Sequence, residues 1–176
     1  MAKGLVGQLL TTEQIQAKVR ELGDQISRDY AGEELLVVGI LKGAFVFCAD
    51  LLRTVTVPCK VDFMAVSSYG QSTESSGVIK IIKDLDSSVE GRHVLLVEDI
   101  VDSGLTLRYL REHLQHQNAK SVKVCVLLDK PSRRKTEVAV DYRGFGIPDE
   151  FIVGYGIDYA ENYRHLPYIG MIGEVD

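Results

Sequence analysis

One feature of the sequence restricts the possible fold of this chain more than any other. It is a run of aliphatic residues that passes directly into acidic residues and then into turn-forming residues. Residues 94–97 are aliphatic, Glu98 and Asp99 follow them, and residues 100–106 read Ile-Val-Asp-Ser-Gly-Leu-Thr. A continuous apolar run of this kind is typical of a strand that is buried on both faces. Ser103 and Gly104 end the run, and a helical pattern opens at Thr106. The sequence therefore predicts a strand, a tight loop and the first turn of a helix.

Strand and helix patterns alternate along the rest of the chain. Strands are predicted over 35–40, 59–67, 78–82, 122–128, 138–142 and 151–155, with a turn at 144–150. Helices are predicted after a capping box formed by Thr11 and Gln14, over 44–53, and from 106 to about 117. This order favours an α/β fold with a mostly parallel sheet flanked by helices. Right-handed crossovers then place the loops that follow residues 40, 97 and 128 at one edge of the sheet.

Composition restricts the partners and the location of the protein. The chain has 176 residues, which suits a single domain, and its formal net charge of −5 argues against a broad basic face for nucleic acid. Its three cysteines are far apart and form no CxxC motif, so we expect buried free thiols in a reducing compartment. The sequence contains neither a secretory pattern nor an apolar run near the length of a membrane span. We therefore expect a soluble, cytoplasmic protein that binds no membrane.

The predicted turn has the chemistry of a phosphate site. The first amides of a helix have no helical partner, Gly104 lets the backbone approach a ligand, and Ser103 and Thr106 add hydroxyl donors. Glu98 and Asp99 lie at the carboxyl end of the strand, where open α/β sheets bind ligands. Backbone amides can hold a phosphate group, and the neighbouring carboxylates can accept hydrogen bonds from hydroxyl groups. This combination suits a phosphorylated sugar. The alternative is an ordinary capped helix with solvated acids.

Residues 94–106 resemble the phosphoribosyl-pyrophosphate signature of type I phosphoribosyltransferases. With Leu41-Lys42-Gly43, Ser67-Ser68-Tyr69-Gly70, Lys130 and the run 151–158, the chain resembles the bacterial hypoxanthine-guanine phosphoribosyltransferase family from about residue 8 to its end. The resemblance implies magnesium-dependent transfer of the phosphoribosyl group from 5-phosphoribosyl 1-pyrophosphate to N9 of hypoxanthine or guanine. The products would be IMP or GMP and pyrophosphate, as in purine salvage, and xanthine is a third candidate base.

The resemblance also implies an architecture. We expect the type I phosphoribosyltransferase fold as a single domain over 1–176, with a small hood formed by the N- and C-terminal segments. Residues 144–176 would contribute most of the base-binding hood, and residues 67–77 would form a flexible lid. The family further suggests a homodimer or a homotetramer.

Roles for the phosphate, the sugar and the metal follow from the same resemblance. The turn Asp102, Ser103, Gly104, Leu105 and Thr106 would hold the 5′-phosphate. Glu98 and Asp99 would bind the ribose hydroxyls and Mg²⁺, and Asp158 would bind a second Mg²⁺ through water. Asp102 would be the catalytic acid or base near N7 of the purine. A helix-capping role is the alternative for Asp102, and surface charge is the alternative for the other acids.

Roles for the base and for pyrophosphate are implied in the same way. Lys130 would donate to the C6 oxygen of the purine, Phe151 would stack on the ring, and the backbone of Ile152 would read its edge. Lys42, Gly43 and Arg164 would bind pyrophosphate, and Ser68 and Tyr69 would begin the lid. The alternatives are that the basic side chains are solvated surface residues, that Phe151 is part of the core, and that the loop predicted as a lid has no function.

Two rival functions use the same fold. A regulator that senses phosphoribosyl-pyrophosphate and binds RNA or DNA would keep the phosphate turn but should gain a basic face, whereas this chain is acidic. A pyrimidine or adenine phosphoribosyltransferase is opposed by Lys130 and by the run 151–158.

Overall fold

The structure is a computed structural model that describes residues 2–68 and 78–175, apart from the side chain of Ser68. Its elements in chain order are β1 (Ala2–Leu10), α1 (Thr12–Asp29), β2 (Leu35–Leu41), α2 (Phe45–Leu52), β3 (Cys59–Ser68), β4 (Ile79–Lys83), β5 (His93–Val101), α3 (Leu105–His116), β6 (Ser121–Asp129), η1 (Pro131–Arg133), β7 (Tyr142–Gly146), β8 (Ile152–Val153) and β9 (Ile169–Val175). The predicted capping box is confirmed, because Thr11 and Gln14 exchange side-chain and backbone hydrogen bonds of 3.1 and 2.8 Å.

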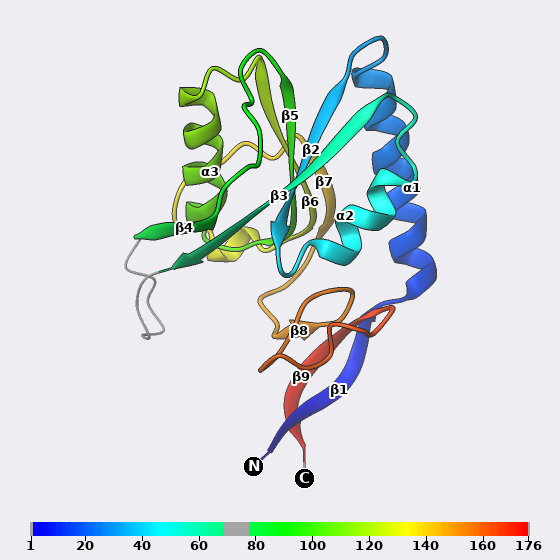
Figure 1. Ribbon diagram of the computed structural model, residues 1–176. Coiled ribbons are helices and arrows are strands. Elements are labelled where there is room, and N and C mark those ends of the chain that lie inside the picture. Colours follow the sequence, from blue (N-terminus) through cyan, green and yellow to red (C-terminus); the bar gives the residue numbers. More distant parts are fainter. Residues whose placement is uncertain (1, 69–77, 176) are drawn as a thin grey trace.

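Six strands of the described chain form the larger sheet, in the order β4-β3-β2-β5-β6-β7. Every neighbouring pair is parallel except β3 and β4, which confirms the predicted mostly parallel sheet. Helices α1 and α2 cover one face of this sheet and α3 covers the other (Figure 1). The central strands alternate between the two faces: Val37 and Leu95 join the core under α1 and α2, whereas Val38 and Leu96 join the core under α3. This two-sided burial explains why the central strands have continuous aliphatic sequences.

The prediction of a strand over residues 138–142 is wrong. The strand in this region is β7, which begins at Tyr142 and continues through the residues predicted as the start of a turn. Val138 and Val140 instead pack on the core beneath α3, and Arg111 donates to the carbonyl of Ala139 at 3.1 Å. Valine favours strands mainly because it packs well on a half-buried surface, and here side-chain packing supplies that burial without strand pairing.

A smaller antiparallel sheet, in the order β1-β9-β8 within the described residues, joins the two ends of the chain. It lies beyond the carboxyl ends of the larger sheet's parallel strands, with both termini together at its far tip (Figure 1). Ile152 of β8 and Ile169 of β9 are buried in the core under α1 and α2, so the small sheet is packed against the main body. This arrangement places the hood residues over the loops where ligands bind in open α/β sheets.

The cysteines are free thiols, with Cys48 and Cys125 buried as predicted and Cys59 half-buried. Burial raises the pKa of the Cys48 thiol to about 11, which leaves it unreactive at neutral pH.

In the described part of the chain, no helix combines the length and the apolar character needed to cross a membrane.

Candidate active site

The segment from β5 to α3 has the predicted order of a strand, a tight loop and the first turn of a helix. Strand β5 ends at Val101, α3 begins at Leu105, and Gly104 is the N-cap residue with a φ of +82°. A Cβ atom at Gly104 would lie 3.0 Å from the carbonyl oxygen of Thr136, so this position needs glycine for both its conformation and its packing. The Ser103 hydroxyl accepts from the Leu105 amide at 3.3 Å, and neither Ser103 nor Asp102 is the N-cap residue of α3.

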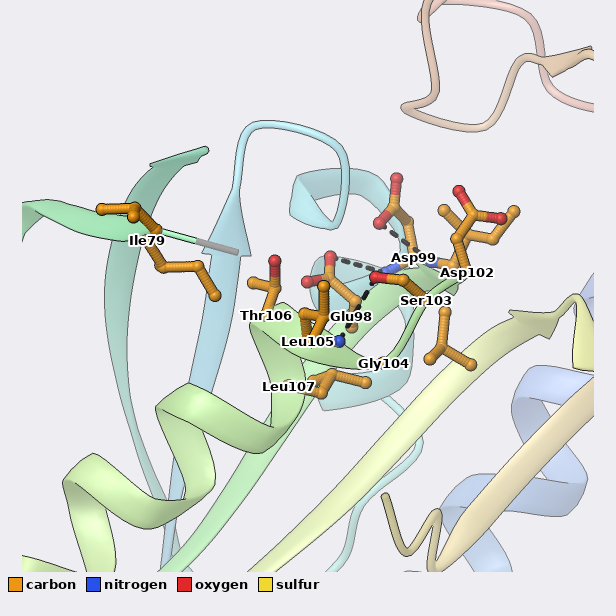
Figure 2. Close-up of a pocket in the computed structure, with 12 residues that line it drawn as sticks. Ile79, Glu98, Asp99, Asp102, Ser103, Gly104, Leu105, Thr106 and Leu107 are labelled. Carbon is orange, nitrogen blue, oxygen red and sulfur yellow. Dashed lines mark hydrogen bonds between the residues drawn. The ribbon is translucent and has the colours of Figure 1, made fainter. Parts of the chain in front are cut away.

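The turn opens into a cavity of about 270 Å³ at the end of β5. The lining residues come from the start of β4, the end of β5, the turn and the first turn of α3; they are Val78, Ile79, Glu98, Asp99, Ile100, Val101, Asp102, Ser103, Gly104, Leu105, Thr106 and Leu107. Figure 2 shows the carboxylates of Glu98, Asp99 and Asp102 gathered beside the turn, with Thr106 at the start of α3. The three acids and the turn therefore line one cavity.

Glu98 and Asp99 are half-buried residues inside β5 rather than surface charges. The Glu98 carboxylate accepts from the Asp99 amide at 3.2 Å, and the Asp99 carboxylate accepts from the Ile100 amide at 2.9 Å. Burial and the adjacent Asp99 carboxylate raise the pKa of Glu98 well above that of an exposed glutamate. A cation or ligand hydroxyl groups would relieve this crowding of negative charge.

The loop after β2 packs directly on this acidic pair. A Cβ atom at Gly43 would lie 2.1 Å from the Asp99 carboxylate, so glycine is required for the loop to approach β5 this closely. The peptide bond between Leu41 and Lys42 is cis. The approach of Gly43 to Asp99 shows that the neighbouring Lys42 lies at the same edge of the sheet as Asp99, as the crossover rule predicted.

Lys42 and Arg164 are joined by an acidic residue that sequence reasoning missed. Glu161 contacts the Lys42 ammonium at 2.9 Å and the Arg164 guanidinium at 3.2 Å, and Arg164 also contacts Asp158 at 3.1 Å. These hydrogen bonds, chiefly the one from Lys42, lower the pKa of Glu161. No local pattern could have revealed this pairing, because Glu161 lies 119 residues from Lys42 in the chain.

Lys130 is buried, with 8% of its surface exposed, so it is not the solvated lysine of the alternative interpretation. Its amide donates to the carbonyl of Val101 at 3.0 Å, which ties the end of β6 to the end of β5. Its ammonium donates to the carbonyl of Glu150 at 2.6 Å and lies 3.8 Å from the Asp149 carboxylate. Sequence reasoning assigned no role to these two partners, which direct Lys130 toward the segment that precedes β8.

Phe151 is 64% exposed, which excludes a core position. Lys3 of β1 lies over its ring at 5.5 Å, and Tyr159 meets its edge at 6.3 Å. Ile152, the next residue, is buried in β8. Of the predicted base-binding residues, Phe151 and Ile152 lie on the hood, whereas Lys130 follows β6 of the larger sheet. Lys42, Lys130, Phe151 and Arg164 all lie outside the lining of the cavity at the turn. Tyr69 and the side chain of Ser68 lie outside the described residues.

Comparisons with known proteins agree with this geometry. The family model described as "Phosphoribosyl transferase domain" matches residues 6–160. The chain is 56% identical over 164 residues to the hypoxanthine-guanine phosphoribosyltransferase of Bacillus subtilis, which covers 93% of this chain and 91% of that protein. It is 51% identical over 176 residues to the hypoxanthine phosphoribosyltransferase of Salmonella typhimurium, which covers 99% of each. A crystal structure of a hypoxanthine-guanine phosphoribosyltransferase from Bacillus anthracis gives a TM-score of 0.92 at 48% identity and covers 98% of this chain and 100% of its own.

Proposed function

The chain belongs to the phosphoribosyl transferase family, and from this premise we propose that it is a purine-salvage hypoxanthine-guanine phosphoribosyltransferase. In the proposed reaction, N9 of hypoxanthine or guanine forms a bond to C1 of 5-phosphoribosyl 1-pyrophosphate, and the bond from C1 to pyrophosphate breaks. The base loses one proton, and the products are IMP or GMP and pyrophosphate. Xanthine is a third candidate base.

The observation that carries the proposal is the cavity that holds both the phosphate turn and the carboxylates. Residues Ser103 to Thr106 line the cavity at the start of α3, where the first amides of a helix could hold a 5′-phosphate. Glu98 and Asp99 stand on the adjoining strand, where their free oxygen atoms could accept from the ribose hydroxyl groups. A sugar that carries a phosphate on its 5-position satisfies both sets of groups at once.

The acidic pair also suits magnesium. Magnesium is typically held by one or two carboxylates together with substrate oxygens and water, so a complete protein cage is not required. Glu98 and Asp99 would hold the ion, and it would neutralise negative charge on the substrate. Asp158, which contacts Arg164, would hold a second ion through water.

Asp102 is the proposed proton acceptor. Its side chain is exposed at the mouth of the cavity and has no capping role in α3, which leaves its carboxylate available to the base. A carboxylate near N7 could take the proton that the purine loses as N9 bonds to C1. General acid–base catalysis of this kind contributes roughly 10²–10⁴-fold to the rate.

The base would be recognised between Lys130 and the hood. The Lys130 ammonium has three donors, and only one is given to the carbonyl of Glu150. A second donor could meet the oxygen at C6 of hypoxanthine or guanine, whereas the amino group of adenine would leave it unpaired. Phe151 exposes a ring on which a purine could stack, and the backbone of Ile152 could read the edge of the base.

Pyrophosphate would bind at the ion-pair cluster of Lys42 and Arg164, next to Gly43. Its oxygens would compete with Glu161 for both basic side chains. The lid role of residues 67–77, including Ser68 and Tyr69, stays a prediction. The homodimer or homotetramer suggested by the family also stays a prediction, which light scattering would test. The free thiols agree with a cytoplasmic location.

One assay tests the function directly. The protein is incubated with phosphoribosyl-pyrophosphate, magnesium and each nucleobase in turn, and nucleotide formation is followed by chromatography. We expect IMP from hypoxanthine and GMP from guanine, no AMP from adenine, and no product when magnesium is removed with a chelator. Formation of AMP or of a pyrimidine nucleotide would contradict the assignment, and so would no reaction with any base.

A further inference from the structure

The cavity at the phosphate turn carries the wrong charge for an anion. Among its described lining residues are three carboxylates, those of Glu98, Asp99 and Asp102, and no lysine or arginine. A phosphate group bound here would therefore face three acids and would be held mainly by neutral donors. Opposite charge within a few ångströms strongly affects anion affinity, so a basic side chain close to the turn should matter.

Arg134 is a basic side chain packed on this turn. Its Cδ atom lies 3.1 Å from the point where a Cβ atom on Gly104 would stand, so its stem rests against the N-cap of α3. The following residues are tied to the same turn, because the amides of Lys135 and Thr136 donate to the carbonyl of Ser103 at 2.9 and 3.2 Å. The Arg134 side chain is 22% exposed, and within the described chain its buried Nη1 atom has no hydrogen-bond partner. The side chain is therefore held beside the turn by its stem and by its ion pair with Asp129.

Asp129 holds this guanidinium in place. The carboxylate is 6% exposed, and it accepts from Nη2 of Arg134 through one oxygen and from Nε of Arg143 at 2.7 Å through the other. One acid between two arginines leaves the cluster with a net charge of +1. Asp129 is also the residue before Lys130, so the same short segment adjoins both the phosphate turn and the proposed base contact.

We propose that Arg134, positioned by Asp129, supplies the positive charge that the phosphate turn itself lacks. This inference rests on the proposed function and adds to it a residue that sets affinity for the phosphomonoester group of the substrate. Arg134 acts on binding by its charge beside the turn, and Asp129 acts through Arg134. Neither residue was assigned a role from the sequence.

Calorimetric titration with ribose 5-phosphate, without magnesium, tests the proposal on the full chain. Arg134→Met removes the charge and keeps the stem on Gly104. Arg143→Met is the matched control, because it removes the other partner of the same buried carboxylate. Arg134→Gln keeps hydrogen-bond donors for Asp129 and covers the case in which the methionine variant does not fold, as judged by circular dichroism.

We expect both Arg134 variants to bind ribose 5-phosphate about tenfold more weakly than wild type, and Arg143→Met to stay within about twofold. Because charge attraction is screened by salt, the loss of affinity on raising ionic strength should be smaller in the Arg134 variants than in wild type. Equal affinities for the Arg134 variants and Arg143→Met, or an unchanged salt dependence, would overturn the inference and leave the proposed function intact. If wild type itself fails to bind ribose 5-phosphate, the inference fails, whereas the proposed function is decided separately by the nucleotide-formation assay.

Discussion

Substituting alanine for Gly104 tests how tightly the phosphate turn is built. An alanine at a φ of +82° adopts the left-handed region, and this backbone strain costs about 1–2 kcal/mol. Its Cβ would also stand 3.0 to 3.1 Å from the Thr136 carbonyl, Val138 and Arg134, and such overpacking typically costs about 1–3 kcal/mol. We therefore expect Gly104→Ala to lower the free energy of unfolding by about 2–5 kcal/mol.

Gly32 provides a matched control. It has the same φ of +82°, but a Cβ atom there would meet nothing within 4 Å. Gly32→Ala should therefore show the backbone strain alone, and urea denaturation of the two variants should differ by the crowding term of about 1–3 kcal/mol. Gly104→Ala should also weaken binding of ribose 5-phosphate, whereas Gly32→Ala should not. Equal losses of stability in the two variants would refute the close packing of residues 134–138 on the turn.

Three further substitutions have distinct outcomes. Asp102→Asn should lower kcat by roughly 10²–10⁴-fold and leave the KM for phosphoribosyl-pyrophosphate nearly unchanged; equal losses in both would count against proton transfer. Glu98→Gln should be more stable than wild type at pH 8 without ligand, because the raised pKa of Glu98 means that its ionisation opposes folding. In thermal melts, the difference in melting temperature between the variant and wild type should shrink as pH falls toward the ordinary glutamate pKa. A difference that does not change with pH would contradict this prediction. Glu161→Gln should strengthen inhibition by pyrophosphate several-fold, since it frees Lys42 and Arg164; unchanged or weaker inhibition would show that Glu161 does not compete.

The central part of the fold could be predicted because its signals are local. The aliphatic residues before Glu98 are buried on both faces of β5, which is why they form an uninterrupted run. The turn was predictable for the same reason, since Ser103 and Gly104 directly follow the strand residues and mark its end in the sequence. The convergence of Lys42 and Asp99 followed from the handedness of crossovers alone.

The hood strands and the ion-pair partners depend on contacts between distant residues. Strands β1 and β9 pair the two ends of the chain, and their sequences contain glycines such as Gly4 and Gly173, which are uncommon in strands. The roles of Glu161 and Arg134 likewise depend on neighbours that only the folded chain provides. The incorrect prediction of a strand over 138–142 has the same cause. Valine residues that pack under α3 cannot be distinguished in the sequence from valine residues that belong to a paired β-strand.

A crystal structure of the protein with bound IMP would test the central claim most directly. The account predicts that the 5′-phosphate lies within hydrogen-bond distance of the amides of residues 103–106, with the ribose hydroxyl groups facing Glu98 and Asp99. A phosphate bound anywhere else, or a ribose turned away from these two carboxylates, would contradict it.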